Sequence, residues 1–146
     1  MILTPSKAVK YLGIWLDTKL TFAEHVQKVK QKVERTTTAS PMPNIGGPRA
    51  SKRRLLSSVI HSLILYTAHV WSTVTKNQKI IRKLASLNRK INIRITSAYR
   101  TVSTEGVVVT AGVPPIELML QERWEKNSGL DARTAKENLM MSWEYK

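Results

Sequence analysis

The sequence predicts a mainly α-helical protein, a helical bundle with one short β-strand or hairpin at its N-terminus. Residues 77–100 carry the clearest helical signal, because their apolar positions recur at spacings of three or four and form one stripe on a helix. The stripe consists of Ile80, Leu84, Leu87, Ile91, Ile95 and Ala98. Residues 51–71 predict a second helix that is cationic at its start and then apolar on almost every side. A helix of that kind is buried, so we expect it to form the core.

Residues 8–17, AVKYLGIWLD, predict a strand, since they are rich in β-branched and aromatic side chains. Both alternating faces are apolar, so we expect the strand to be buried. Gly13 in its middle indicates a bulge or a close backbone approach. The strand needs a partner, which is either residues 1–4 or a segment outside this chain.

A third helix is predicted to start at Thr21, because Thr21 and Glu24 have the spacing of a capping box. Its apolar face comprises Phe22, Val26, Val29 and Val33. The threonines at 36–38 weaken a helix, and Pro41 and Pro43 should end it. The loop at 43–48 contains two glycines, but no Gly-Lys-Ser or Gly-Lys-Thr follows them, so it predicts a turn and not a phosphate-binding loop.

The chain after Arg100 has a different pattern. Residues 103–109 predict a short helix that stops at Gly112, and Pro114-Pro115 starts another helix, IELMLQERWEKN. The tail at 128–146 is weakly patterned and predicts no element.

The positive charge is concentrated in the first two thirds of the chain. The net charge is +14; residues 1–100 hold 19 Lys or Arg against three acids, a balance of +16, and residues 101–146 hold five against seven, a balance of −2. Such a field favours nucleic acid or an anionic membrane surface as a partner. The cations alternate with apolar periodicity, so we expect a folded basic face and not a disordered tail.

Several classes of protein are disfavoured. The chain has no cysteine, which excludes disulfides and thiolate metal sites. The N-terminus lacks the basic head and apolar run of a secretory signal, so we do not expect a secreted protein; the lack of cysteine suits the nucleus or the cytoplasm, and the sequence does not choose between them. The longest apolar stretch, residues 55–71, is shorter than the roughly 20 residues that span a bilayer.

Nine residues are predicted to contact nucleic acid. The cations at the start of the helix at 51–71 oppose its dipole, which indicates a bound phosphate there. Tyr99 and Arg100 lie at the end of the basic helix, where a ring beside a guanidinium suits a base or phosphate, although an Arg near a helix C-terminus also favours the dipole. The full set is Arg49, Lys52, Arg53, Arg54, Lys83, Arg89, Lys90, Tyr99 and Arg100.

Three further aromatic residues are predicted to belong to the core and not to a binding site. Trp15, Tyr66 and Trp71 each lie within an apolar run, so we expect them to be buried.

No catalytic or metal-binding residue is predicted. The acids include no pair spaced for metal ions, and no serine lies in a Gly-x-Ser-x-Gly elbow. His25, His61 and His69 do not have the spacing of a ligand cluster.

A set of short motifs resembles reverse transcriptases of LINE-type (non-LTR) retrotransposons, in particular arthropod elements. The matching stretches, in family order over roughly residues 8–125, are Val9-Lys10-Tyr11-Leu12-Gly13, Leu20-Thr21-Phe22 with His25, Pro43-Asn44-Ile45-Gly46-Gly47-Pro48, Leu65-Tyr66 with Val70-Trp71, Ala98-Tyr99-Arg100-Thr101-Val102-Ser103-Thr104-Glu105, and Ala111-Gly112-Val113-Pro114-Pro115-Ile116 with Glu122-Arg123. The chain departs from the family at three places: Thr38-Ala39-Ser40-Pro41 shortens a helix that is usually longer and rich in Leu, Thr67 stands where the signature has Gly, and Gly106 stands where a helix former is usual.

The resemblance implies a C-terminal piece of the polymerase, divided into an end-of-palm strand region at 1–20, a basic helical thumb at 21–100, and connector helices with a poorly patterned tail at 101–146. In that family the thumb grips the template–primer duplex. The catalytic Asp-Asp motif, the Mg²⁺ that the parent enzyme uses and the endonuclease belong to other parts of the polyprotein. The chain itself is therefore expected to need no cofactor.

The resemblance implies RNA, DNA or an RNA–DNA hybrid as partner, together with the palm and fingers of the polymerase. An alternative is a partner-binding module, or an inert relic of the polyprotein, that needs the palm in order to fold. Binding to a membrane surface is not expected, because the stripe at 77–100 lacks the aromatic anchors of interfacial helices.

Overall fold

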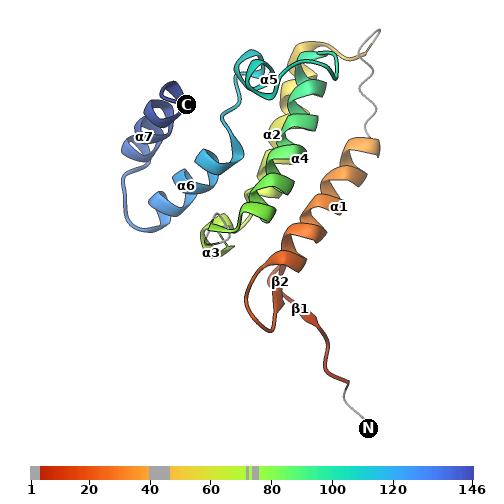
Figure 1. Ribbon diagram of the computed structural model, residues 1–146, viewed down its shortest axis with the longest axis vertical. Coiled ribbons are helices and arrows are strands. Elements are labelled where there is room, and N and C mark those ends of the chain that lie inside the picture. Colours follow the sequence, from red (N-terminus) through yellow and green to blue (C-terminus); the bar gives the residue numbers. More distant parts are fainter. Residues whose placement is uncertain (1–3, 40–46, 72, 74–75) are drawn as a thin grey trace.

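The computed structural model describes residues 4–39, 47–71, 73 and 76–146. The described chain begins with an antiparallel hairpin of β1 (Ala8–Tyr11) and β2 (Ile14–Asp17), in which Ala8 pairs with Asp17 and Tyr11 with Ile14. Helices make up most of the rest (Figure 1): α1 (Ala23–Ala39), α2 (Ala50–Ile64), α3 (Ala68–Trp71), α4 (Gln78–Thr96), α5 (Thr104–Ala111), α6 (Ile116–Asn127) and α7 (Ala132–Glu144). The prediction of a mainly α protein with an N-terminal hairpin is confirmed.

Helices α1, α2 and α4 form a three-helix bundle in which each contacts the other two. Helices α1 and α4 run in one direction and α2 runs against them (Figure 1). The core lies between them and extends under α3 and α6; its fully buried members include Val33, Ile60, Ile64, Trp71, Leu84, Ile116 and Leu120. Burial of these apolar side chains is what holds the bundle together.

The predicted stripe of α4 is the buried one. Ile80, Leu84, Leu87, Ile91 and Ile95 are all in the core. The helix starts at the predicted place, because the Asn77 side chain accepts a hydrogen bond from the Lys79 N–H at 3.1 Å and caps it. It ends at Thr96, since Ser97 turns left-handed with φ 56°, so the predicted extension to Arg100 is wrong.

The prediction of one helix over 51–71 is also wrong. The chain leaves the helix after Ile64 and re-enters it at Ala68, because Thr67 has φ 51° in the left-handed region. The apolar stretch at 62–71 is not buried on every side either, because the Val70 side chain is 41% exposed. Apolar composition without periodicity did not show which side would face water.

Residues 8–17 form two strands and not one. Leu12 and Gly13, with φ 47° and 87°, make the turn between them, and β1 is largely exposed. The close approach predicted at Gly13 is confirmed, because a Cβ there would lie 3.0 Å from Cε1 of Tyr66. The Tyr66 ring itself is 53% exposed, against the prediction that it is buried, and its hydroxyl donates to the carbonyl of Leu12.

The start of α1 is organised mainly by Asp17, and the predicted capping box forms only in part, since the Thr21 hydroxyl accepts from the Ala23 N–H at 3.5 Å. One carboxylate oxygen of Asp17 accepts from the Thr21 N–H at 2.9 Å and from the Lys19 N–H at 3.0 Å, and the other accepts from the Thr21 hydroxyl at 2.8 Å. The hydrogen bond from the Thr21 N–H is the main reason that the pKa of Asp17 is lowered. Glu24 instead pairs with Lys28 at 3.8 Å, and α1 begins at Ala23.

The far end of α1 stays helical through the three threonines predicted to weaken it. Each hydroxyl at 36–38 donates to the carbonyl four residues earlier, so none is left without a partner. The prolines at 41 and 43 and most of the predicted 43–48 loop lie outside the described residues.

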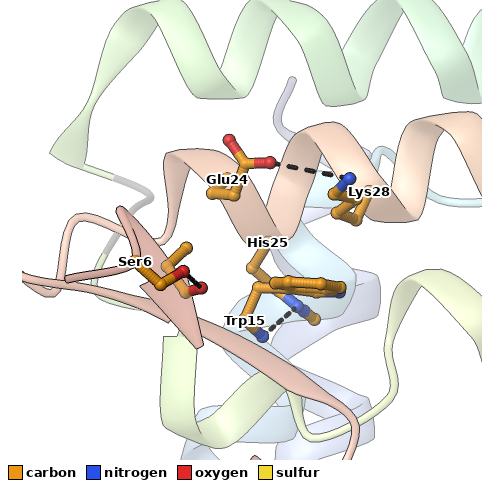
Figure 2. A network of polar contacts seen from close by, with 6 residues as sticks. Ser6, Trp15, Glu24, His25 and Lys28 are labelled. Atoms are coloured by element: carbon orange, nitrogen blue, oxygen red, sulfur yellow. Dashed lines mark hydrogen bonds and ion pairs between the residues drawn. The ribbon is translucent and has the colours of Figure 1, made fainter. Parts of the chain in front are cut away.

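The hairpin is fastened to α1 through three side chains (Figure 2). The main-chain N–H of Trp15 donates to Nδ1 of His25 at 3.4 Å, and Nζ of Lys28 lies 5.0 Å from the centroid of the Trp15 ring. The other side of His25 meets Trp71 edge to face, with ring centroids 5.4 Å apart. His25 is buried, and this burial lowers its pKa. Trp71 is fully buried as predicted, whereas Trp15 is only half-buried.

The last third of the chain adds three helices on the side of the bundle away from α1 (Figure 1). Helices α5 and α6 form as predicted: the Ser103 hydroxyl caps α5 by accepting from the Gly106 N–H at 3.1 Å, and Gly112 ends it with φ 66°. The tail, for which no element was predicted, forms α7 and packs on α6. The side chain of Asp131 caps it, and Ala135 and Leu139 are buried one turn apart.

Candidate nucleic-acid interface

The outer face of α4 carries a row of exposed cations. Lys79, Arg82, Lys83 and Lys90 all lie opposite the buried stripe, because spacings of three, four and seven return to the same side of a helix. Lys90 lies 3.7 Å from Glu34 on α1, and since both side chains are exposed this ion pair is weak. The face therefore keeps a positive charge.

A second group of cations lies where α2 begins. Arg49, Lys52 and Arg54 are exposed there, and the first turn of α2 contains no acid. Arg49 stands at the N-cap position, and its side chain makes no capping hydrogen bond. The helix dipole and these cations have the same sign, so together they favour an anion at this terminus.

Arg53, in the middle of that group, has a different position. It is 4% exposed; its Nε donates to the carbonyl of Pro48 at 2.9 Å and its Nη1 to the carbonyl of Arg94 at 2.8 Å. Arg94 in turn donates to the carbonyl of Thr37 at 3.0 Å. These contacts join the start of α2 to the ends of α4 and α1, so we assign Arg53 a structural role and leave it out of the contact set.

Arg89 is a second guanidinium that binds main-chain carbonyls. Its Nε donates to the Thr104 hydroxyl at 3.2 Å, and its Nη2 donates to the carbonyls of Arg100, at 3.0 Å, and Val102. Arg89 thus fixes the loop that joins α4 to α5. On that loop Tyr99 is 80% exposed and Arg100 is exposed.

The structure therefore divides the nine predicted contact residues into three groups. One group lies at the end of the bundle where α4 finishes. It comprises Arg49, Lys52 and Arg54 at the start of α2, together with Tyr99 and Arg100 after α4, and the contact between Arg53 and Arg94 joins these two segments. Lys83 and Lys90 lie along the outer face of α4. Arg53 and Arg89 hold main chain. Lys79 and Arg82 were missing from the set, although their spacing from Lys83 shows that they share its face.

Two other classes of site are absent from the described part of the chain. Its His, Asp and Glu side chains form no group of three or more that could hold a metal ion. Its helices include none with the length and apolar content needed to cross a membrane.

Comparison with known proteins supports the resemblance inferred from the motifs. No protein-family model matches the chain, and no solved structure matches it. It is 28% identical over 118 residues to the putative 115 kDa protein in type-1 retrotransposable element R1DM of Drosophila melanogaster, which covers 77% of this chain and 11% of that protein. It is also 28% identical over 125 residues to the RNA-directed DNA polymerase from mobile element jockey of the same organism. The matched region covers 82% of this chain and 13% of that protein.

The chain thus spans only about an eighth of the length of these relatives or less. Both relatives come from mobile elements, and one is an RNA-directed DNA polymerase. The resemblance to proteins of LINE-type retrotransposons is therefore confirmed over about four fifths of this chain.

Proposed function

We propose that this chain is a nucleic-acid-binding segment of a retrotransposon RNA-directed DNA polymerase, and that it grips a template–primer duplex through the sugar–phosphate backbone. It supplies binding and no catalytic residue. The observation that carries the proposal is the pair of cationic surfaces on one bundle, the outer face of α4 and the start of α2, in a region with three acids in 100 residues. Because the chain is similar to the jockey polymerase, we expect the polyanion that these surfaces bind to be a nucleic acid.

Contacts of this kind depend on shape and charge and not on sequence. Lysines that project from one helix face at spacings of four and seven meet successive phosphates, which carry no base information. Binding is therefore expected to be similar for different sequences and to weaken steeply with salt, because each contact releases a counterion.

Reversal of two charges on the outer face of α4 tests the proposal. Lys79→Glu with Lys83→Glu is expected to weaken binding to an RNA–DNA hybrid by at least about tenfold and to reduce the salt slope by about two. Neither change should unfold the chain, because both side chains are exposed and a Glu at 79 suits the first turn of α4. Fluorescence anisotropy at several salt concentrations measures both quantities.

A matched control makes the same change in net charge elsewhere. Arg133→Glu with Lys136→Glu reverses two exposed cations on α7, outside both surfaces. If the two double variants lost the same amount of affinity for the hybrid, only total charge would matter, and the proposed interface would be wrong. Loss for one nucleic-acid sequence but not another would also contradict it.

The hairpin supports a second candidate function, a protein-docking module. Among the residues that the structure describes, its outer strand β1 pairs with β2 alone; Val9 and Tyr11 are exposed on β1 and Leu12 in the turn. A two-stranded hairpin with an apolar open edge favours a further strand from another protein segment, such as the polymerase palm. In that case the isolated chain should lack a cooperative urea transition by circular dichroism until a fragment that contains the palm is added.

A further inference from the structure

The loop between α4 and α5 is held rigidly around one exposed aromatic ring. Arg89 binds the carbonyls of Arg100 and Val102, and the Val102 N–H donates to the carbonyl of Tyr99 at 3.2 Å. Before the ring, the N–H groups of Ser97 and Ala98 both donate to the carbonyl of Ile93. The main chain on each side of Tyr99 is therefore fixed.

The side chain of Tyr99 has no such restraint. It is 80% exposed, and its hydroxyl makes no hydrogen bond to any residue that the structure describes. A fixed main chain under a free ring lowers the entropy that is lost when the ring binds a partner. This arrangement is pre-organised for stacking.

The charges near the ring indicate the chemistry of the partner. Arg100 follows Tyr99 directly, and the contact between Arg53 and Arg94 brings the start of α2, with exposed Arg49 and Lys52, to the end of α4. An exposed aromatic ring with cations in the neighbouring segments suits a base, because those cations can bind the phosphates that flank it. A base inside a duplex is already stacked on both faces, so only an unpaired base can use the ring.

We propose that Tyr99 is a stacking platform for an unpaired nucleobase at the end of the bound duplex. This inference rests on the proposed function, because the duplex must be held by the cationic surfaces. Arg89 is the positioning residue: it touches no nucleic acid and sets the loop that presents the ring.

The test measures how tightly the full chain binds two different RNA–DNA hybrids. One hybrid is blunt, and the other carries a short single-stranded extension whose first unpaired base is 2-aminopurine, a fluorescent purine that is quenched when it stacks. Tyr99→Ala is expected to weaken binding of the extended hybrid by about tenfold, to relieve the quenching, and to leave the blunt hybrid unchanged. Tyr99→Phe should keep the wild-type behaviour, since it keeps the ring.

Two further variants separate stacking from loss of structure. Tyr145→Ala removes an 89% exposed tyrosine after α7 and should change neither hybrid. Arg89→Lys keeps a charge but loses the planar fork that binds two carbonyls, so it should reduce the quenching while Tyr99 is still present. If Arg89→Lys leaves the quenching intact, the positioning role is wrong.

Failure of this inference can be distinguished from failure of the proposed function. If the wild type binds both hybrids with a steep salt dependence and Tyr99→Ala changes neither, the stacking site is refuted and the duplex-binding function stands. If the wild type binds neither hybrid, both are refuted. Equal weakening of both hybrids by Tyr99→Ala would make Tyr99 a general contact and would overturn the stacking role.

Discussion

The two ends of the α1–α2–α4 bundle are closed in different ways. At the end where α4 finishes, guanidinium groups of Arg53 and Arg94 bind main-chain carbonyls from neighbouring segments. At the end where α1 begins, the hairpin is held through His25, whose Nδ1 accepts from the main-chain N–H of Trp15 and whose ring meets the Trp71 ring edge to face. Guanidinium groups stay charged at all ordinary pH values, whereas a buried imidazole does not. The stability of the first end should therefore not depend on pH, whereas that of the second should.

The largest effect on stability is expected from Arg53. Replacing it by Ala should lower the free energy of unfolding by about 3 kcal/mol, because it opens the joint between α2 and α4 and leaves the carbonyls of Pro48 and Arg94 without their donor. Urea unfolding followed by circular dichroism measures this. Lys52→Ala, one residue away and exposed, should change it by less than about 0.5 kcal/mol. Similar losses in both variants would show that the guanidinium contacts do not close this end.

The pH dependence of stability should come from the hairpin end. The pKa of His25 is lowered in the folded state, so between that pKa and the ordinary value of 6.5 the unfolded chain binds more protons. Stability should therefore fall as the pH drops below about 6.5, by at most about 1.4 kcal/mol per pH unit. His25→Gln should flatten this slope in urea titrations between pH 5 and 8. An unchanged slope would show that His25 is not its source.

The smallest effect on stability is expected at Thr67, and it is an increase in the free energy of unfolding. Its φ of 51° costs a β-branched residue about 1 kcal/mol, which glycine does not lose. Thr67→Gly should raise the free energy of unfolding by about 1 kcal/mol, seen as a higher urea midpoint with an unchanged m value. Thr67→Ala keeps a Cβ and should recover much less. A decrease in stability with Gly would mean that the break between α2 and α3 is not strained.

These comparisons also show what the sequence could predict. The α4 stripe was predictable because one face is apolar and the other is cationic, so its period is unambiguous. The break at Thr67 was missed, because a Thr gives no local indication of positive φ; the Gly at this place in the family signature was the one indication. Helix α7 was missed although Asp131, Ala135 and Leu139 supply a cap and a short stripe.

The predicted contact set shows the same limit. Composition located the positive charge in residues 1–100, but it gave Arg53 and Lys52 equal weight. Which of them faces water depends on which side of α2 meets α4, a contact between segments about 40 residues apart. The row at Lys79, Arg82 and Lys83 follows from helical spacing alone and could have been found.

The salt dependence of binding tests the central claim most directly. The purified chain is titrated onto a labelled RNA–DNA hybrid at several salt concentrations, while circular dichroism confirms that it is helical. Contacts from five or more exposed cations predict that log Kd changes with log salt with a slope of about four or steeper. A folded helical chain that shows no binding, or binding without salt dependence, would contradict the account.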